Sequence, residues 1–161
     1  MNDTQSQESR ILVYGIGNPG RRDDGLGAEC VARLEAAKLH HVTADANYQL
    51  NVEDALVCSQ YDAVIFVDAA KNREEPFTWK EVKPTIGISF TTHELAPSSL
   101  LALVAELYGR HPKAYLLAIS GYDWEIGEGL SEQAEQNLRL ALDSLKKFLK
   151  KLTDPSRLYD E

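Results

Sequence analysis

Uninterrupted runs of apolar residues mark the places where this chain is expected to form buried strands. The runs cover residues 11–15, 62–70 and 113–121, and a parallel strand that is covered on both faces is apolar throughout. A shorter run predicts a second strand at 40–45. Residues 77–83 alternate between apolar and polar side chains and are bracketed by prolines, which predicts an edge strand.

Apolar residues spaced three and four apart predict helices between these strands. The first helix is expected after Gly25, and it runs to about residue 38. A second is expected over 97–108, because Pro97 suits a first turn and Gly109 suits a helix end. A long terminal helix is expected from Ser131, its cap, to about residue 152.

A short helix is expected after the second strand. Asn51 is predicted to cap it, with Val52, Ala55 and Leu56 facing inward. Strands and helices then alternate along the whole chain, which predicts a three-layer α/β/α sandwich around a twisted, mostly parallel sheet of about five strands. The length of 161 residues suits a single domain, residues 1–161, with mobile ends at 1–9 and 155–161.

Composition and charge narrow the function classes. A net charge of −8 argues against nucleic acid as a partner, since non-specific binding to nucleic acid needs a basic surface. The polar residues 1–10 lack the apolar core of a signal peptide, and no apolar run approaches the roughly 20 residues of a membrane span. Cys30 and Cys58 are expected to be buried thiols. We therefore expect a cytoplasmic protein that is a monomer and does not bind membranes.

The first strand runs into a glycine-rich turn that permits two interpretations. Gly15, Gly17 and Gly20 match the spacing of the dinucleotide fingerprint, in which glycines let the backbone approach a diphosphate. Pro19 removes one amide donor from this turn, and two adjacent acids follow it. A non-catalytic nucleotide-binding or assembly module thus remains an alternative function.

The adjacent acids Asp23 and Asp24 also have two interpretations. Either carboxylate could cap the following helix, because acids favour its positive end. Capping accounts for one carboxylate and leaves the second without a role. The alternative is that one of them belongs to a functional site at the end of the strand.

Three side chains are expected to meet at one edge of the predicted sheet. Asp24 follows the first strand, Asp68 ends the strand at 62–70, and His93 lies in a loop that leads into a helix. Ligands bind at the carboxyl ends of strands in open α/β sheets. Two carboxylates and an imidazole are suitable ligands for a divalent transition metal, so this trio predicts a metal site.

The sequence does not match other known catalytic motifs. The segment from His93 begins like a zinc-protease helix, but Pro97 stands where the second ligand would be. No Gly-x-Ser-x-Gly elbow is present. His40, His41 and His111 are expected to be structural, and Trp124 either packs against the sheet edge or anchors a partner.

These motifs together resemble the nickel–iron hydrogenase maturation endopeptidases. The first block is Gly15-Ile-Gly-Asn-Pro-Gly-Arg-Arg-Asp-Asp-Gly-Leu-Gly. The later blocks follow in the same order: Ile65-Phe-Val-Asp-Ala, Thr92-His93-Glu94-Leu95, Ile119-Ser-Gly and Gly129-Leu130-Ser131. The resemblance covers nearly the whole chain.

The resemblance implies both a reaction and a site. Members remove a C-terminal extension from the hydrogenase large-subunit precursor after nickel insertion. Their metal-binding and catalytic residues correspond here to Asp24, Asp68 and His93, one carboxylate also assisting the attack of water. The nickel is supplied by the substrate, and cadmium or zinc could occupy the same position.

The resemblance also implies a substrate cleft near Gly17, Asn18 and Gln49. The segment Tyr48-Gln49-Leu50 is similar to a His-Gln-Leu found in members that serve NAD-linked bidirectional hydrogenases. Many other members have a glycine-rich segment there, so the client hydrogenase stays open. A relative that keeps the site but cleaves a different precursor is a further alternative.

The opening Gly-Ile-Gly-Asn-Pro-Gly also resembles peptidyl-tRNA hydrolase. That family continues into a block with a catalytic histidine, whereas Arg22-Asp23-Asp24 occupies the region here. The acidic net charge also disfavours tRNA as a partner.

Overall fold

The computed structural model describes residues 9–71, 73–85, 90–91 and 94–154. The terminal segments that were expected to be mobile lie outside this range, except for Ser9. So does His93, one of the three predicted site residues.

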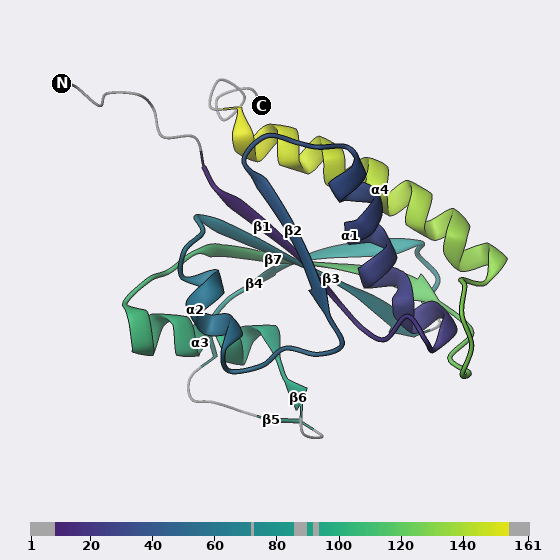
Figure 1. The fold of residues 1–161 in the computed structure, drawn as a ribbon, viewed down its shortest axis with the longest axis horizontal. Coiled ribbons are helices and arrows are strands. Elements are labelled where there is room, and N and C mark those ends of the chain that lie inside the picture. The colour runs from purple at the N-terminus through teal and green to yellow at the C-terminus, as the bar shows by residue number, and fades with distance from the viewer. Residues whose placement is uncertain (1–8, 72, 86–89, 92–93, 155–161) are drawn as a thin grey trace.

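One five-stranded sheet forms the middle of the molecule (Figure 1). Its strand order is β2-β1-β3-β7-β4, in which the first four run parallel and β4 pairs antiparallel with β7 at one edge. The strands are β1 (Ile11–Ile16), β2 (Val42–Asn47), β3 (Ala63–Lys71), β4 (Phe77–Val82) and β7 (Lys113–Gly121). A separate two-stranded pair joins β5 (Phe90–Thr91) to β6 (Glu94–Leu95).

Helices cover both faces of the sheet, which confirms the predicted three-layer α/β/α architecture (Figure 1). On one face lie α1 (Leu26–Ala36) and α4 (Glu132–Thr153), and on the other lie α2 (Asp54–Cys58) and α3 (Pro97–Tyr108). A single 3₁₀ turn, η1 (Arg22–Gly25), precedes α1 and has no counterpart in the sequence predictions.

The alternation of side chains along β3 divides the core into two clusters. Ala63, Ile65 and Val67 pack under α1 and α4, while Val64 and Phe66 pack under α2 and α3. All five are buried, so the strand is covered on both faces as its apolar run predicts. By the same alternation, Asp68 lies on the face of β3 that α2 and α3 cover.

Most helix ends follow the predicted signals. Ser131 caps α4, since its hydroxyl accepts the N–H of Ala134 at 3.3 Å. Pro97 is in the first turn of α3, and Gly109 ends that helix with a φ of 62°, a left-handed conformation that suits glycine. The second strand begins two residues later than predicted, at Val42.

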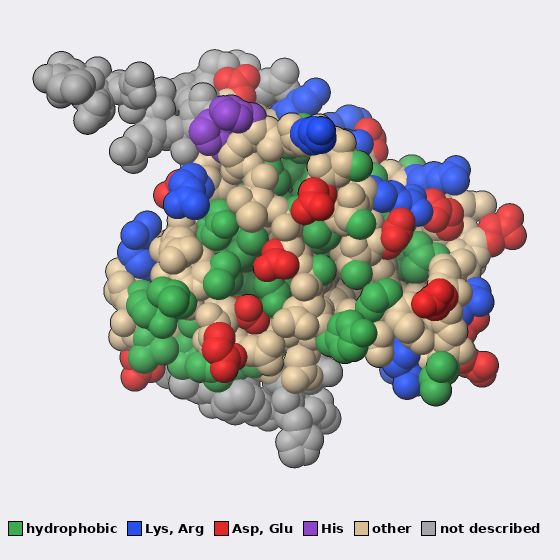
Figure 2. All heavy atoms as spheres, viewed as in Figure 1, with side chains coloured by type: hydrophobic (Ala, Val, Ile, Leu, Met, Phe, Trp, Pro, Cys, Tyr) green, Lys and Arg blue, Asp and Glu red, His purple; other side chains and the backbone are tan. Residues whose placement is uncertain are grey.

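The predictions for the short helix α2 were wrong in part. Asn51 does not cap it; instead the carboxylate of Asp54 accepts the N–H of Asn51 at 2.8 Å. Ala55 is buried as expected, but Val52 and Leu56 are each 48% exposed. The helix has only five residues and begins at Asp54, so Val52 lies in the turn before it and Leu56 lies on its exposed face. Figure 2 shows acidic and hydrophobic side chains interspersed over α2 and β2.

The two thiols are buried on opposite sides of the sheet. Cys30 lies in the cluster under α1 and α4, and Cys58 lies in the cluster under α2 and α3. Burial raises the pKa of each thiol to about 12. This confirms the expectation of buried thiols. Among the described residues, no helix combines the length and apolar character needed to cross a membrane.

Candidate functional site

The order of the strands identifies the edge of the sheet where a ligand is expected. The chain leaves β1 for β2 on one side and later returns to β3 on the other side. Such a reversal opens a crevice at the carboxyl ends of the two neighbouring strands, where open α/β folds bind ligands. Here these are the carboxyl ends of β1 and β3.

Two glycines bring the turn after β1 into close contact with this edge. A Cβ atom on Gly27 would overlap the carbonyl oxygen of Val67 in β3. Gly17 has a φ of 130°, and a Cβ atom there would overlap the carbonyl oxygen of Asp24. The start of α1 is thus packed directly on β3, and η1 also contacts that strand.

Asp24 is half-buried in this turn and is held by the backbone of Asn18. One of its carboxylate oxygens, Oδ2, accepts the N–H of Asn18 at 2.8 Å. The Asn18 side chain accepts the N–H of Gly20 at 2.8 Å, so it shapes the turn rather than binding Asp24 itself. The other oxygen of Asp24 accepts no hydrogen bond from the described residues. Neither Asp23 nor Asp24 caps α1 with its side chain, so the capping interpretation was wrong for both.

Asp68 lies near the carboxyl end of β3, on the strand next to β1. It is half-buried, and its Oδ1 accepts the N–H of Ala69 at 2.8 Å. The strand before it packs on α3 through Phe66, and Leu95 of β6 lies in the same cluster. Asp24 and Asp68 thus belong to the same edge of the sheet, as the sequence predicts.

The third predicted ligand is His93, which lies outside the described residues. Among the residues that the structure describes, no three His, Cys, Asp or Glu side chains are grouped closely enough to hold a metal ion. The full trio of Asp24, Asp68 and His93 remains a prediction. Two carboxylates and one imidazole are a donor set that suits nickel, zinc or cadmium.

The predicted cleft residues lie around the same edge. Gly17 and Asn18 form the turn after β1, and the N–H of Gly17 donates to the carbonyl of Asn47 at the end of β2 at 3.1 Å. Gln49 follows two residues later with an exposed side chain. Whether Gln49 contacts a substrate stays a prediction.

The main-chain N–H groups of this turn are already used within the protein. The N–H groups of Gly17, Asn18 and Gly20 make the hydrogen bonds described above. The N–H of Arg21 donates to the carbonyl of Asn18 at 3.0 Å, and the N–H groups of residues 22 to 24 donate to other main-chain carbonyls. Pro19 has no N–H. The turn therefore offers no amides for a diphosphate, which argues against the nucleotide-binding alternative.

Asp23 has a role that the sequence predictions missed. Its side chain is fully buried and accepts four hydrogen bonds from the segment after β7. The donors are the N–H groups of Tyr122, Asp123 and Ser131 and the hydroxyl of Ser131, at 2.7 to 2.9 Å. Burial by itself raises the pKa of Asp23. The four hydrogen bonds lower the pKa by more than burial raises it, so the pKa lies below its ordinary value. Asp23 is a buried carboxylate that fixes the 122–131 segment to the turn.

Main-chain contacts continue this attachment on both sides of Asp23. Arg22 donates its N–H to the carbonyl of Gly127 at 2.9 Å, and Gly127 donates to the carbonyl of Gly20 at 2.9 Å. The Trp124 side chain packs beside Gly121 at the end of β7, where a Cβ atom would lie 3.0 Å from the ring. Of the two interpretations of Trp124, packing at the sheet edge is the one observed.

The remaining histidines lie away from this edge. The carbonyl of His41 accepts the N–H of Ile11 at the start of β1, which is the opposite end of that strand. His111 comes just before the start of β7, also at the amino ends of the strands. Figure 2 shows a patch of histidine side chains at the upper left of the view, and His40 and His41 lie together with ring centroids 3.8 Å apart.

Comparison with known proteins places the fold. No protein-family model matches the sequence, and no curated protein sequence is similar to it. Among solved structures, the nickel–iron hydrogenase maturation protease HycI from Thermococcus kodakarensis KOD1 has a TM-score of 0.70 at 24% identity, over 92% of this chain and 97% of its own. The hydrogenase maturating endopeptidase HybD from E. coli also has a TM-score of 0.70, at 23% identity over 88% and 93%.

A third similar structure is the hydrogenase 2 maturation peptidase from a Thaumarchaeota archaeon. Its TM-score is 0.65 at 24% identity, over 87% of this chain and 97% of its own. At these identities the similarity establishes the fold. The chain has the fold of the hydrogenase maturation proteases, the same fold that its sequence motifs imply.

Proposed function

We propose that this protein is an endopeptidase of the hydrogenase maturation family, acting in the cytoplasm. Its substrate is the large-subunit precursor of a nickel–iron hydrogenase, and it removes the C-terminal extension after nickel insertion. The observation that carries this proposal is the location of Asp24 and Asp68 at the carboxyl ends of β1 and β3, in the fold of known maturation proteases.

In this proposal the nickel ion is part of the substrate. Asp24, Asp68 and His93 contact the ion on the precursor, and a carboxylate at the same edge assists water in attacking the scissile amide. Bound nickel thereby reports that the precursor is complete. Gly17, Asn18 and Gln49 line the path of the peptide beside that edge.

The test is incubation with nickel-loaded and nickel-free precursor, followed by mass measurement of the products. We expect loss of the extension from the loaded precursor alone. Asp24→Asn, Asp68→Asn and His93→Ala should each abolish the cleavage. Asparagine at position 24 keeps an oxygen that can accept the N–H of Asn18, so this variant should retain the turn.

Asp45→Asn is the matched control for these variants. Asp45 is an exposed carboxylate on the neighbouring strand β2, and it is not part of the proposed site. This variant should process the precursor at the normal rate. Cleavage of nickel-free precursor would contradict the role of nickel, and continued cleavage by all three site variants would contradict the choice of residues.

A further inference from the structure

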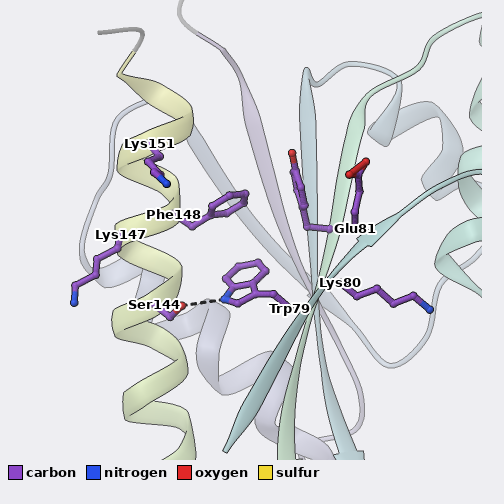
Figure 3. A pocket seen from close by; sticks show the side chains of 8 residues that line it. Trp79, Lys80, Glu81, Ser144, Lys147, Phe148 and Lys151 are labelled. Carbon is purple, nitrogen blue, oxygen red and sulfur yellow. Dashed lines mark hydrogen bonds between the residues drawn. The ribbon is translucent and has the colours of Figure 1, made fainter. Parts of the chain in front are cut away.

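A second surface feature lies between α4 and the edge strand β4, away from the candidate site. It is a groove of about 690 Å³ (Figure 3). Trp79 and Glu81 reach it from β4, Tyr115 reaches it from β7, and the helix supplies Phe148 and Lys151. Glu81 pairs with Tyr115 near the amino end of β7, so the groove extends toward the edge of the sheet opposite Asp24 and Asp68.

The floor of this groove is aromatic and is held in place by side-chain contacts. The indole N–H of Trp79 donates to the hydroxyl of Ser144 at 2.9 Å. The Phe148 ring lies 5.0 Å from the Trp79 ring and 4.9 Å from the Tyr115 ring, measured between centroids. Figure 3 shows Trp79 and Phe148 projecting toward one another from β4 and α4. All three rings are only partly buried, so the floor presents apolar surface that is already organised.

The strand beside this floor has an outer edge that no strand of the described residues pairs with. β4 is the outermost strand of the sheet, and within the described residues it pairs with β7 alone. The main-chain groups on its outer edge can therefore pair with a further strand. An extended peptide that adds to a sheet edge gains main-chain hydrogen bonds, and its alternate side chains fill neighbouring pockets.

The charge around the groove selects the kind of peptide. Three lysines line it against one acid, although the chain as a whole carries a net charge of −8. Lys147 and Lys151 lie on α4, and Lys80 projects to the other side of β4 (Figure 3). Lys147 is paired with Asp143 at 3.1 Å, but both side chains are exposed and such pairs are weak.

We propose that the outer edge of β4 and this groove bind an acidic, extended segment of a partner protein as a sixth strand of the sheet. Apolar residues of the segment pack on Trp79 and Phe148, and its carboxylates pair with Lys147 and Lys151 on one face and Lys80 on the other. A second copy of this chain fits less well, because edge-to-edge pairing would bring lysines of the two copies together. This proposal does not depend on the proposed protease function.

The test is fluorescence anisotropy with a fluorescein-labelled peptide in which glutamate alternates with leucine. We expect saturable binding to the full chain that weakens with added salt. The same peptide with lysine in place of glutamate should bind about tenfold more weakly or worse. A version with proline at alternate positions should also lose binding, because it cannot donate main-chain hydrogen bonds.

Two double variants provide the matched comparison on the protein. Lys147→Glu with Lys151→Glu reverses the charge beside the groove and should raise the Kd about tenfold. Lys146→Glu with Lys150→Glu makes the same change in net charge on α4 outside the groove and should change the Kd by less than about twofold.

Equal effects of the two double variants, or equal binding of the lysine peptide, would overturn the proposal. The double variant Leu158→Ser with Tyr159→Ser tests the chain's own C-terminal segment as the occupant. If the peptide binds this variant but not the unmodified protein, the C-terminal segment occupies the groove and the proposal is overturned. The proposal would also be overturned if the chain forms dimers in solution and the double variant Lys147→Glu with Lys151→Glu disrupts them. The groove would then bind a second copy of this chain instead of a partner protein.

Discussion

Asp23 and Ser131 are joined by two hydrogen bonds although 108 residues separate them in the chain. The N–H of Ser131 donates to Oδ1 of Asp23 and its hydroxyl donates to Oδ2, each at 2.7 Å. The same hydroxyl accepts the N–H of Ala134 in the first turn of α4. The start of the last helix is thus attached to the turn that carries Asp24.

Replacing Asp23 should destabilise the fold strongly. Asp23→Ala leaves three main-chain N–H groups and one hydroxyl without their acceptor, and we expect the free energy of unfolding to fall by about 3 kcal/mol or more. Ser131→Ala removes the cap and one of the four bonds, and should lower it by about 1–2 kcal/mol. Urea unfolding monitored by circular dichroism measures both.

The neighbouring acid is the control for this prediction. Asp24→Asn should lower the free energy of unfolding by less than about 1 kcal/mol, because the asparagine can still accept the N–H of Asn18. Equal unfolding midpoints for Asp23→Ala and Asp24→Asn would contradict the assignment of a structural role to Asp23 and not to Asp24.

Two glycines of the same turn should respond differently to alanine. Gly17→Ala introduces a Cβ atom at a φ of 130°, where it overlaps the carbonyl oxygen of Asp24, so we expect a loss of about 2–4 kcal/mol in stability. In Gly20→Ala the new atom meets only the Asn18 side chain, at 3.2 Å, and the change should stay within about 1 kcal/mol. Thermal unfolding of the two variants is the measurement, and a Gly17→Ala protein as stable as Gly20→Ala would contradict the close contact.

The ion pair between α1 and α4 should make stability depend on pH in the acid range. Arg33 donates two hydrogen bonds to Glu135, at 2.6 and 2.7 Å, and lowers the pKa of that carboxyl to about 2 from an ordinary value of 4.5. Because the pKa is lower in the folded state, the stabilisation is fully present above about pH 4.5 and is lost as the pH falls toward 2.

Glu135→Gln tests this dependence. At pH 7 the variant should be less stable than the unmodified protein by about 1 kcal/mol, given the partial exposure of the pair. The difference should shrink toward zero as the pH falls from 4.5 to 2. Glu128→Gln, in the exposed loop before α4, should have little effect on stability. A Glu135→Gln difference that is constant from pH 7 to pH 2 would exclude the low pKa.

Calorimetry should separate the two functions that the glycine-rich turn suggested. NAD, FAD and ATP should produce no binding heat, because the main-chain N–H groups of the turn already donate within the protein. Nickel or cadmium should bind, and Asp24→Asn or Asp68→Asn should weaken that binding. Tight nucleotide binding without metal binding would favour the alternative module.

The sequence was sufficient to predict the sheet, its helices and the shared edge of two acids. The apolar run over β3 and the stripes of α3 and α4 depend on local spacing, which the sequence contains directly. Asp24 and Asp68 could be placed together because Asp24 follows one parallel strand and Asp68 lies near the carboxyl end of another. That inference needed only the parallel direction of the strands, and not their order in the sheet.

The role of Asp23 could not be predicted in the same way. Three of its four donors are main-chain N–H groups, which every residue except proline carries, so no residue pattern identifies them. Ser131 was recognisable as a cap, but its second contact depends on how the chain returns to the turn. Val52 was placed wrongly because the helix begins only at Asp54, and Leu56 because helical spacing does not say how much of a five-residue helix the neighbouring α3 covers.

The contact between Asp23 and the 122–131 segment has a consequence during synthesis. The carboxylate of Asp23, in the turn that carries Asp24, acquires all four of its donors only after residue 131 has been synthesised. A nascent or truncated chain that lacks this segment leaves Asp23 without its donors, and burying an unpaired carboxylate beside β3 costs free energy. The buried carboxylate of Asp23 is thus satisfied only once nearly the whole polypeptide has been made.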